Sequence, residues 1–495
     1  MELVCHRPDH EPRRLAEMDV PATTAADVKT STTAADPEGA LVALQAVLEP
    51  SYLTCDLGLV ESHRRDEADW AQAGLPLAVA HPRTTAQVAD VVRVCGRYGV
   101  PIVTRGAGTG VSGGANAVDG CLVLCTEQMR TIIEINPAER LAVVQPGVVN
   151  DDLRTAVAAH GLWYPPDPSS AALSTIGGNV ATNAGGLCCV KYGVTRDYVL
   201  AMEVVTAAGE VVRLGRRTAK GVAGYDLVGL MVGSEGTLGV ITEVTVRLRP
   251  ARSAPTRTIV GFFDTLPASG AAVAAVMESG VEPAIFELMD RHCLAAVNAW
   301  KHTGLPDDAA VLLLAQTDLP EPEAHIHAKG IHAEFVRAGA TQAIMSTDAV
   351  EAEALFAARR MVFSALQQRG DLIMVEDVCL PRGRLAEMLV RVEEIAAGHE
   401  TFIANAAHAG DGNLHPMLIC PKDDEAAKTR AQAAFAEIVD AAIDMGGTVS
   451  GEHGVGLLKI EGMRRELGPI AVGMQRAIKL ALDPRGILNP GKAIG

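Results

Sequence analysis

Aromatic residues are scarce in this chain of 495 residues, since Phe, Trp and Tyr together make up 3% of it. A stacking platform for single-stranded nucleic acid is therefore not expected. Basic residues are also in the minority, with 43 Lys and Arg against 60 Asp and Glu and a formal net charge of −17. Nucleic acids and anionic membranes attract basic surfaces, so neither is predicted as a partner.

Long apolar runs and C-x-x-C cysteine pairs are missing as well. No stretch approaches the roughly 20 apolar residues of a membrane-spanning helix, and the N-terminal MELVCHRPDHEPRR lacks the basic-then-apolar order of a secretory signal. None of the ten cysteines forms a C-x-x-C pair, which argues against zinc ribbons and the common iron–sulfur spacings. We expect a cytoplasmic protein with buried thiols and no iron–sulfur relay of its own.

The amino-acid composition and the apolar pattern change along the chain, and these changes predict four segments. Residues 1–40 are rich in Ala, Thr, Asp and Pro, which is typical of a flexible leader. Residues 41–250 combine strand-like and helix-like runs with glycine-rich loops. Helix-like Ala/Glu stretches alternate with strand-like runs over 251–450, which predicts a second α/β domain. Residues 451–495 are glycine-rich again and are expected to return to the first domain.

Local patterns in 41–250 predict individual elements. Apolar residues at helical spacing follow Thr84 and Thr85 and stop at Gly99, which predicts an amphipathic helix. The runs PIVT (101–104) and CLVLC (121–125) predict strands on either side of a glycine loop. A short helix is predicted from 151 to 160, capped by Asn150 and stopped by Gly161.

The glycine loop TRGAGTGVSGGA occupies residues 104–115. Residues 108–113 satisfy G-x-G-x-x-G, and Glu127 lies near the acidic position of a dinucleotide-binding fingerprint. That fingerprint must open a helix, whereas 111–120 hold further glycines and no helical apolar stripe. No Gly-Lys-Ser/Thr follows, so a Walker loop is excluded. We predict an anion nest of backbone N–H groups, with a plain surface turn as the alternative.

Two further backbone-rich segments predict a long ligand with phosphates in its middle. GGNVATNAGG follows seventy residues later and carries Asn179 and Asn183 as side-chain donors or acceptors. We expect it to form a second loop of the same kind. GSEGTLGVIT (233–242) adds a third segment. Each alone is compatible with an ordinary turn, but three in one domain favour a shared binding site.

Taken in order, these motifs resemble the FAD domain of the vanillyl-alcohol-oxidase (PCMH-type) flavoproteins. They are PRTTAQVADVVRVC, PIVTRGAGTGVSGGA, PPDPSS, STIGGNVATNAGG and GSEGTLGVITEV. The later HAGDGNLHP, SGEHGVGLLK and LDPRGILNPGK resemble the branch of D-lactate dehydrogenases, D-2-hydroxyglutarate dehydrogenases and the FAD-bearing subunit of bacterial glycolate oxidase. The likeness covers about 50–495. It implies an α+β fold, with an FAD-binding domain of two α/β subdomains and an α/β substrate (cap) domain built on an antiparallel sheet.

The resemblance also implies which residues contact FAD. The flavin nucleotide would be held by Arg105, Gly106, Ala107, Gly108, Thr109, Gly110, Gly147, Pro168, Ser169, Ser170, Thr175, Gly177, Gly178, Asn179, Asn183, Gly185, Glu235, Gly236, Ile241 and Asn489. Covalent attachment of FAD is not expected. His81, just before the first predicted helix, is interpreted as an ordinary loop histidine.

HAGDGNLH places His408 and His415 seven residues apart, with two glycines between them. Two ligands on one helix would be four apart, so this spacing instead suits a strand and turn where two imidazoles converge. With Glu452 they could form an open site for zinc or another borderline divalent ion. Solvated loop histidines are the alternative. The resemblance favours the metal, with His408, His415 and Glu452 as its ligands.

The resemblance assigns His453 as the catalytic base and Arg359 as the group that binds the substrate carboxylate. A metal lowers the pKa of a bound oxygen, so an imidazole of near-neutral pKa could take its proton. A guanidinium matches a carboxylate, while neighbouring Arg360 is expected to be solvated. Val375 and Phe363 stand where the 2-hydroxyglutarate branch has Lys and Thr, which favours a small monocarboxylate.

The sequence therefore predicts an FAD-dependent, metal-assisted dehydrogenase of a small D-2-hydroxy acid, either glycolate or D-lactate. Its electrons would pass to an iron–sulfur subunit, a quinone or oxygen, with contact to the inner membrane through such a partner. The alternatives are a D-2-hydroxyglutarate dehydrogenase, a non-catalytic FAD-binding subunit and an alkyl-ether-lipid synthase relative.

Overall fold

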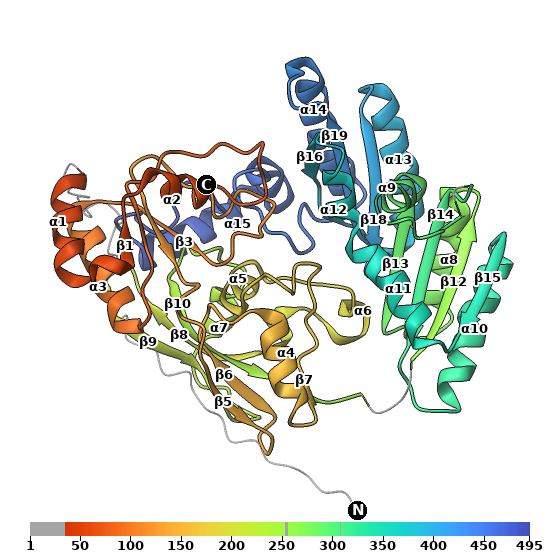
Figure 1. The fold of residues 1–495 in the computed structure, drawn as a ribbon, viewed down its shortest axis with the longest axis horizontal. Helices are drawn as coiled ribbons and strands as arrows, with labels where there is room; N and C mark the ends of the chain where they lie inside the picture. The colour runs from red at the N-terminus through yellow and green to blue at the C-terminus, as the bar shows by residue number, and fades with distance from the viewer. Residues whose placement is uncertain (1–34, 253–255, 307) are drawn as a thin grey trace, which may run out of the picture. The chain divides into compact units, whose positions relative to one another are not determined.

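The computed structural model describes residues 35–252, 256–306 and 308–495 (Figure 1). Residues 1–34 of the predicted leader lie outside this part. Its last four residues belong to helix α1 (Pro37–Val47), whose first turn is capped by Asp36 through a 2.9 Å hydrogen bond from the Gly39 N–H. Ala40 and Leu44 are buried. Ordered helix therefore begins earlier than the composition indicated, because a capping residue precedes it.

The glycine loop lies between two buried parallel strands. β3 (Ile102–Arg105) and β4 (Leu122–Cys125) belong to a four-stranded sheet of order β1-β2-β4-β3, with β1 at Leu53–Thr54 and β2 at Ala78–Ala80. Helix α3 (Thr85–Tyr98) begins at the cap Thr84 and ends at Gly99, whose φ of 67° is left-handed. The prediction of this helix is confirmed. No helix lies between β3 and β4 in the described chain, which agrees with excluding a dinucleotide fingerprint.

A second sheet is antiparallel, in the order β5-β6-β10-β8-β9. Its strands are β5 (Ile132–Asn136), β6 (Leu141–Val144), β10 (Val240–Arg247), β8 (Val199–Val205) and β9 (Val211–Gly215). Helices α4 (Asn150–Ala158) and α5 (Ile176–Thr182) bury Leu153, Val157 and Ile176 in the same apolar cluster as these strands. This sheet supports the second and third backbone-rich segments.

Two predictions in this region are wrong in detail. Asn150 does not cap α4, because it is the first helical residue and its side-chain Nδ2 donates instead to the Pro166 carbonyl at 3.2 Å. GGNVATNAGG is not a loop throughout, because 176–182 form α5. Thr175 caps this helix, and Asn183 ends it in the left-handed conformation at φ 56°. These two residues outweigh the low helix propensity of paired glycines.

Residues 257–420 contribute a large antiparallel sheet of order β15-β12-β14-β13-β18-β19-β16, with β17 paired to β19. The strands are β12 (Arg257–Phe263), β13 (Ile285–Asp290), β14 (Val311–Thr317), β15 (Gln342–Ser346), β16 (Leu372–Val375), β17 (Val378–Cys379), β18 (Phe402–His408) and β19 (Asn413–Cys420). The predicted α+β class with an antiparallel sheet is confirmed.

Helices cover both faces of this large sheet (Figure 1). One face packs on α8 (Leu266–Glu278), α10 (Glu323–Arg337), α13 (Leu385–Gly398) and α14 (Glu425–Asp444). The other packs on α9 (Arg291–Lys301), α11 (Ala349–Arg360) and α12 (Val362–Gln367). Alternate residues of β14 serve the two faces, as the two-residue strand period requires: Leu313 faces the first set and Leu312 the second. Both faces are buried, so the sheet reads as a continuous apolar run.

The C-terminal segment reaches back to the first sheet. After α15 (Ile460–Leu482), which is kinked at Gly468–Pro469, Leu488 forms a parallel bridge with Ile102 of β3. The Asn489 side chain then donates to the carbonyls of Gly114 and Glu235 at 3.0 and 2.7 Å. Residues 488–489 thus hold the glycine loop at both ends, through β3 before it and through the Gly114 carbonyl within it.

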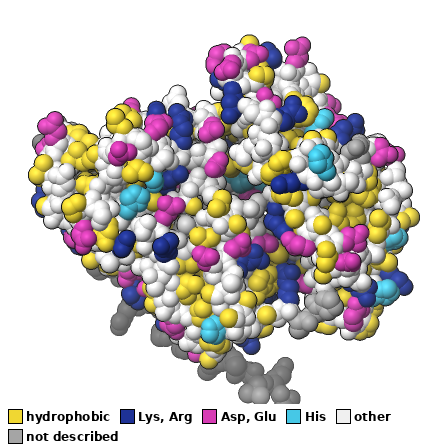
Figure 2. All heavy atoms as spheres, in the orientation of Figure 1, with side chains coloured by type: hydrophobic (Ala, Val, Ile, Leu, Met, Phe, Trp, Pro, Cys, Tyr) yellow, Lys and Arg dark blue, Asp and Glu magenta, His cyan; other side chains and the backbone are white. Residues whose placement is uncertain are grey.

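Acidic and basic side chains are interspersed over the face shown in Figure 2. The net negative charge is therefore not gathered into a patch of one sign on that face. Within residues 35–252, 256–306 and 308–495, no helix combines the length and the apolarity needed to cross a membrane.

Two glycines in helix interiors should respond oppositely to alanine. A Cβ on Gly270 of α8 would lie 2.3 Å from the Ala386 Cβ of α13, whereas a Cβ on Gly473 of α15 meets nothing within 4 Å. We expect Gly473→Ala to stabilise the protein by up to about 1 kcal/mol. Gly270→Ala should destabilise it by about 1–3 kcal/mol, because overpacking outweighs propensity. Urea unfolding checks both, and a stabilised Gly270→Ala variant would contradict the helix packing.

Candidate active site

A single cavity of about 460 Å³ connects the glycine loop to the predicted chemistry residues. Arg359, His415, Glu452 and His453 line one part of it. Most of the predicted FAD residues line the remainder: Gly106, Ala107, Gly108, Thr109, Gly110, Pro168, Ser169, Ser170, Thr175, Gly177, Gly178, Asn179, Glu235, Gly236 and Ile241. Segments far apart in the sequence therefore share one binding space.

The polar lining of this cavity fits a ligand rich in hydrogen-bonding groups. Thr104 Oγ1, Ser174 Oγ and Asn179 Nδ2 belong to cavity-lining residues of two segments, are buried and have no hydrogen-bond partner in the protein. Buried polar atoms are normally paired, so these three atoms indicate a bound partner. The adjacent glycine loop lets a ligand approach the main chain. A dinucleotide such as FAD meets both requirements.

Five predicted FAD residues lie outside the cavity lining, and their contacts are within the protein. The Arg105 guanidinium donates to the Arg65 carbonyl at 2.6 Å, and Asn183 Oδ1 accepts from the Arg196 N–H at 2.8 Å. Asn489 joins two backbone segments, as described above. The other two are Gly147 and Gly185, where an added Cβ would lie 2.4 Å from Thr126 O and from Glu452 Oε2, respectively. These residues shape the walls, and their role toward FAD stays a prediction.

Two buried carboxylates lie beside the glycine loop. Glu235 accepts the backbone N–H groups of Val455 and Gly456 at 2.8 Å each, so it ties the C-terminal segment to the cavity. Asp66 was missed by sequence reasoning; it lines the cavity and accepts the Ala68 N–H at 3.0 Å. Burial raises the pKa of Asp66 to about 6 and also raises that of Glu235. An Asp in the polar stretch ESHRRDEAD carries no sequence signal of such burial.

The His408–His415 spacing is that of a β-hairpin. β18 ends at His408 and β19 begins at Asn413, so residues 409–412 form the turn. In the antiparallel register His408 pairs with Asn413 and Ala406 with His415. Directly paired residues point to the same face, as do residues two apart. Both imidazoles therefore project from one face, with ring centroids 5.1 Å apart.

One carboxylate oxygen is the meeting point of three imidazoles. Glu452 Oε1 lies 3.1 Å from His408 Nε2, 3.3 Å from His415 Nε2 and 3.7 Å from His453 Nε2. Ligand atoms that surround a tetrahedral zinc ion at about 2.0–2.1 Å lie roughly 3.3 Å apart. The separations of Glu452 Oε1 from His408 Nε2 and His415 Nε2 are close to that spacing, and the three donor atoms all lie within 4.8 Å of one another, so this donor set fits a divalent ion.

Glu287 fixes the orientation of His408. Its Oε1 lies 2.7 Å from His408 Nδ1, and both side chains are almost fully buried. When Nδ1 donates to this carboxylate, Nε2 keeps its lone pair toward Glu452. Burial lowers the pKa of His408, but the charges of Glu287 and Glu452 outweigh burial and raise it well above its usual value. The site therefore attracts positive charge, whether proton or metal.

Asp377 plays the same part for the loop that carries Glu452 and His453. Its buried Oδ2 accepts the backbone N–H groups of Glu452 and His453 at 3.0 and 2.8 Å and the Ser450 hydroxyl at 2.9 Å. Sequence reasoning assigned no role to Glu287 or Asp377. Each lies in a largely apolar strand-like run, FELMD and LIMVED, where an acid among apolar residues is the available signal of a buried charge.

His453 lies against His415 with the ring centroids 4.9 Å apart and the planes 16° from parallel. Burial lowers the pKa of His453, the neighbouring Asp377 carboxylate opposes this, and the resulting pKa is about 4. This pKa lies below the near-neutral value expected from the sequence, because burial disfavours the charged imidazolium. At neutral pH His453 is uncharged and can accept a proton, but as a weaker base than expected.

Arg359 lies at the end of α11, where the helix breaks at Met361 before α12 begins. Its Nε is 2.9 Å from Glu287 Oε2, in an ion pair that is not aligned as a hydrogen bond. Arg359 Nη2 is buried without a partner and the side chain lines the cavity. Arg360 also lines the cavity, but it pairs with Glu353 and is 38% exposed. Phe363 and Val375 line the cavity as an apolar pair.

Gly185→Ala should weaken metal binding at the predicted site without replacing any of its three predicted ligands. The new Cβ would collide with the Glu452 carboxylate, so the carboxylate must turn away from the two imidazoles. Displaced supporting contacts typically cost 10–100-fold in metal affinity, which is about the loss expected. Chelator competition measures it, with Gly398→Ala as control because a Cβ there meets nothing within 4 Å. Unchanged affinity in Gly185→Ala would remove Glu452 from the ligand set.

The raised pKa of Asp66 predicts a pH-dependent stability difference. The pKa is about 6 in the folded protein against an ordinary 3.8, so ionisation opposes folding and stability falls as pH rises through this window. Relative to Asp66→Asn, the free energy of unfolding of the wild type should fall by about 3 kcal/mol between about pH 4 and pH 6. Above that range the difference between the two proteins should stay constant. Urea unfolding across this range measures the difference. A difference that does not vary with pH would contradict the burial of this carboxylate.

Comparison with known proteins places this geometry in a family. Residues 76–215 match the FAD binding domain model and residues 252–493 match the C-terminal domain of FAD linked oxidases. The chain is 41% identical to glycolate oxidase subunit GlcD of Bacillus subtilis, covering 84% of this chain and 89% of that protein. It is 34% identical to a D-lactate dehydrogenase of Anaerostipes hadrus, over 87% and 92% of the two chains.

A solved structure agrees in fold. The 4-ethylphenol oxidase of Gulosibacter chungangensis superposes with a TM-score of 0.78 at 19% identity, covering 93% of this chain and 98% of that one. At this identity the likeness concerns the fold alone. Two matched FAD-oxidase domains, close relatives over most of the sequence and a cavity suited to a dinucleotide lead to one conclusion. The chain belongs to the PCMH-type FAD-linked oxidases, in the branch that includes the GlcD subunit and D-lactate dehydrogenases.

Proposed function

We propose that this chain oxidises a small D-2-hydroxy acid, glycolate or D-lactate, to the 2-oxo acid in an FAD-dependent, metal-assisted reaction. The observation that carries the proposal is the shared cavity: His415, Glu452, His453 and Arg359 line the same space as the glycine loop. The names of the relatives, a glycolate oxidase subunit and a D-lactate dehydrogenase, support the substrate class.

When bound, FAD accepts a hydride from the α-carbon and a divalent ion, with zinc favoured, polarises the hydroxyl oxygen. The residues that would hold that ion are His408, His415 and Glu452, whose donor atoms all lie within 4.8 Å of one another. Two imidazoles and a carboxylate suit a borderline ion and leave a position open for substrate. Glu287 holds His408 in the tautomer this requires.

Arg359 would bind the substrate carboxylate. Its guanidinium has a buried nitrogen, Nη2, without a protein partner, and it lines the cavity. Glu287 occupies Nε, so it fixes the guanidinium while leaving other nitrogens for the ligand. Phe363 and Val375 offer no charge or hydrogen bond to a second carboxylate. This favours a monocarboxylate over 2-hydroxyglutarate, which is the second candidate substrate.

His453 would take the hydroxyl proton. Its Nε2 lies on the side of Glu452, beside the donor atoms of the metal site, and the ring lines the cavity. Its low pKa keeps the imidazole unprotonated at neutral pH, so it is ready to accept a proton without first losing one. Asp377 accepts the backbone N–H of His453, which would keep the imidazole in the same position during turnover.

The electrons would leave the flavin for another carrier. GlcD is named as a subunit, so that relative works with further subunits. We infer a comparable partner here, an iron–sulfur subunit or a quinone. A cytoplasmic location, at the inner membrane only through that partner, fits the nine described cysteines, which are all free thiols.

Replacing the proposed base separates catalysis from cofactor binding. His453→Asn keeps a polar side chain of similar size but has no basic nitrogen, so flavin reduction should fall by about 10²–10⁴-fold. FAD content should not change. The measurement is anaerobic bleaching of the flavin by glycolate, D-lactate and D-2-hydroxyglutarate. Reduction at the wild-type rate would favour a non-catalytic FAD-binding subunit or another base, and no reduction of the wild type by any of the acids would defeat the proposal.

Adjacent arginines give a matched test of carboxylate binding. Arg359→Lys keeps the charge beside Glu287 but loses the planar fork, so KM for the hydroxy acid should rise by about tenfold, the equivalent of one lost charge-assisted hydrogen bond. Arg360→Lys should raise KM less than Arg359→Lys does, because Arg360 also lines the cavity but its guanidinium is held by Glu353. Steady-state kinetics with a dye acceptor measures both. Equal effects of the two substitutions would contradict the assignment.

A further inference from the structure

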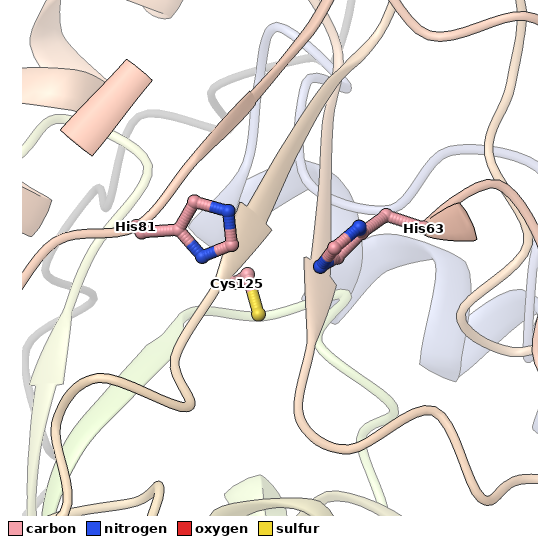
Figure 3. A group of neighbouring side chains, drawn as sticks. All are labelled: His63, His81 and Cys125. Atoms are coloured by element: carbon pink, nitrogen blue, oxygen red, sulfur yellow. The ribbon is translucent and has the colours of Figure 1, made fainter. Parts of the chain in front are cut away.

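A second group of metal-binding side chains lies at the edge of the first sheet and uses none of the residues of the proposed active site. His63, His81 and Cys125 each offer one donor atom, and these atoms all lie within 4.8 Å of one another (Figure 3). None of the three was given a ligand role by sequence reasoning, which took His81 for an ordinary loop histidine. They come from segments separated by up to about sixty residues, so the fold brings them together.

The parallel pairing of β2 and β4 explains two of the three positions. Ala80, the last residue of β2, is paired with Leu124, so His81 directly after β2 lies next to Cys125, the last residue of β4. Cys125 is also paired with Arg105 of β3. His63 is the residue that ends helix α2 (Leu57–Ser62). Side chains from two strand ends and one helix end therefore meet where neighbouring parallel strands stop.

The orientation of His63 is set by its own helix. Its Nδ1 lies 2.9 Å from the Leu59 carbonyl, and the Ser62 hydroxyl is 3.0 Å away and donates to the same carbonyl. A ring nitrogen beside a carbonyl must donate, so Nδ1 carries the proton and Nε2 keeps its lone pair. Metal-binding histidines characteristically hold their second nitrogen in this way.

Figure 3 shows the two rings facing the space beside the Cys125 sulfur. The ring centroids of His63 and His81 are 5.3 Å apart and the rings are at 82° to each other. Both histidines are half-buried, whereas Cys125 is fully buried. An ion could thus reach the site from the histidine side.

A carboxylate stands next to the sulfur. Glu127 Oε2 lies 3.2 Å from Cys125 Sγ, close enough to accept the thiol proton or to become a fourth donor. One sulfur, two imidazole nitrogens and a carboxylate oxygen form a set that thiolate-binding ions prefer over Mg²⁺ or Ca²⁺.

We propose that His63 Nε2, His81 and Cys125 Sγ bind a thiolate-preferring divalent ion of the zinc class, with Glu127 or water completing a four-coordinate shell. Binding replaces the thiol proton by the metal, and the proton leaves to Glu127 or solvent. The bound ion joins the end of α2 to the ends of β2 and β4. Thr126, which follows Cys125, lines the flavin cavity, so the same ion would steady one of its walls.

Cobalt substitution tests this site on the FAD-loaded protein. Stripped protein is titrated with Co²⁺, and tetrahedral cobalt is followed in the red, where the flavin does not absorb. We expect wild type to bind one more cobalt ion per chain than Cys125→Ser. Cys121→Ser is the matched control, since Cys121 is a buried thiol just before the same strand. It should bind cobalt like wild type.

A second pair of variants separates this site from the proposed active site. His415→Ala should lose one cobalt ion but keep the one that depends on Cys125, while His63→Gln should lose that one and keep the other. X-ray absorption at the cobalt edge shows whether each sample contains a cobalt–sulfur bond and therefore thiolate ligation. Flavin content and thermal unfolding show that each variant is folded. Equal cobalt binding in wild type, Cys125→Ser and His63→Gln, or no cobalt–sulfur bond in the wild type, would overturn the proposal.

Discussion

The arrangement on which the site depends is the sharing of one carboxylate oxygen of Glu452 among three imidazoles. His408 and His415 reach it from a hairpin of the large sheet, and His453 reaches it from the same loop as Glu452. The loop itself is fastened on one side by Asp377 and on the other by Glu235, which belongs to the FAD-binding half of the sequence. The Glu452 carboxylate and its loop thus connect the large antiparallel sheet, the C-terminal segment and the wall of the flavin cavity.

Such a cluster is costly to bury, because each charge loses its hydration. The structure offsets this cost by pairing each buried acid with a cation or with N–H donors. Glu287 pairs with Arg359 and His408, and Lys459 lies 3.2 Å from Glu376. Burial raises the pKa of Asp377, but neighbouring His453 and Lys459 outweigh it and lower the pKa to about 2. Asp377 therefore stays ionised at neutral pH, and His408 likewise lowers the pKa of Glu452 despite its burial, whereas burial raises the pKa of Glu376 to about 7.

Much of this could be predicted from the sequence, because the signals were local or were carried by the family motifs. The helix ending at Gly99, the strands around the glycine loop and the absence of a helix after that loop follow from periodicity and glycine placement. The seven-residue spacing of His408 and His415 also indicated a turn, and the structure has a hairpin there. The domain boundaries at residues 250 and 450 and the roles of the individual site residues remain predictions.

What could not be predicted depends on contacts distant in sequence. Glu287 and Asp377 orient the imidazoles, but nothing in their own strands shows which side chains they will meet. The low pKa of His453 arises from burial, which no motif encodes. The meeting of His63, His81 and Cys125 follows from the pairing of β2 with β4. The helix at 176–182 was not predicted, because the two glycines in its first turn have low helix propensity although Thr175 and Asn183 cap its ends.

The central claim is that a divalent ion held by two imidazoles and a carboxylate lies in the same cavity as the flavin. Anomalous diffraction from crystals of the FAD- and zinc-loaded protein, collected on both sides of the zinc absorption edge, tests it most directly. We predict an anomalous peak bonded to His408 Nε2, His415 Nε2 and the Glu452 carboxylate, with the flavin ring in the adjoining part of the cavity. Occupied flavin density without zinc between these three side chains would contradict the account.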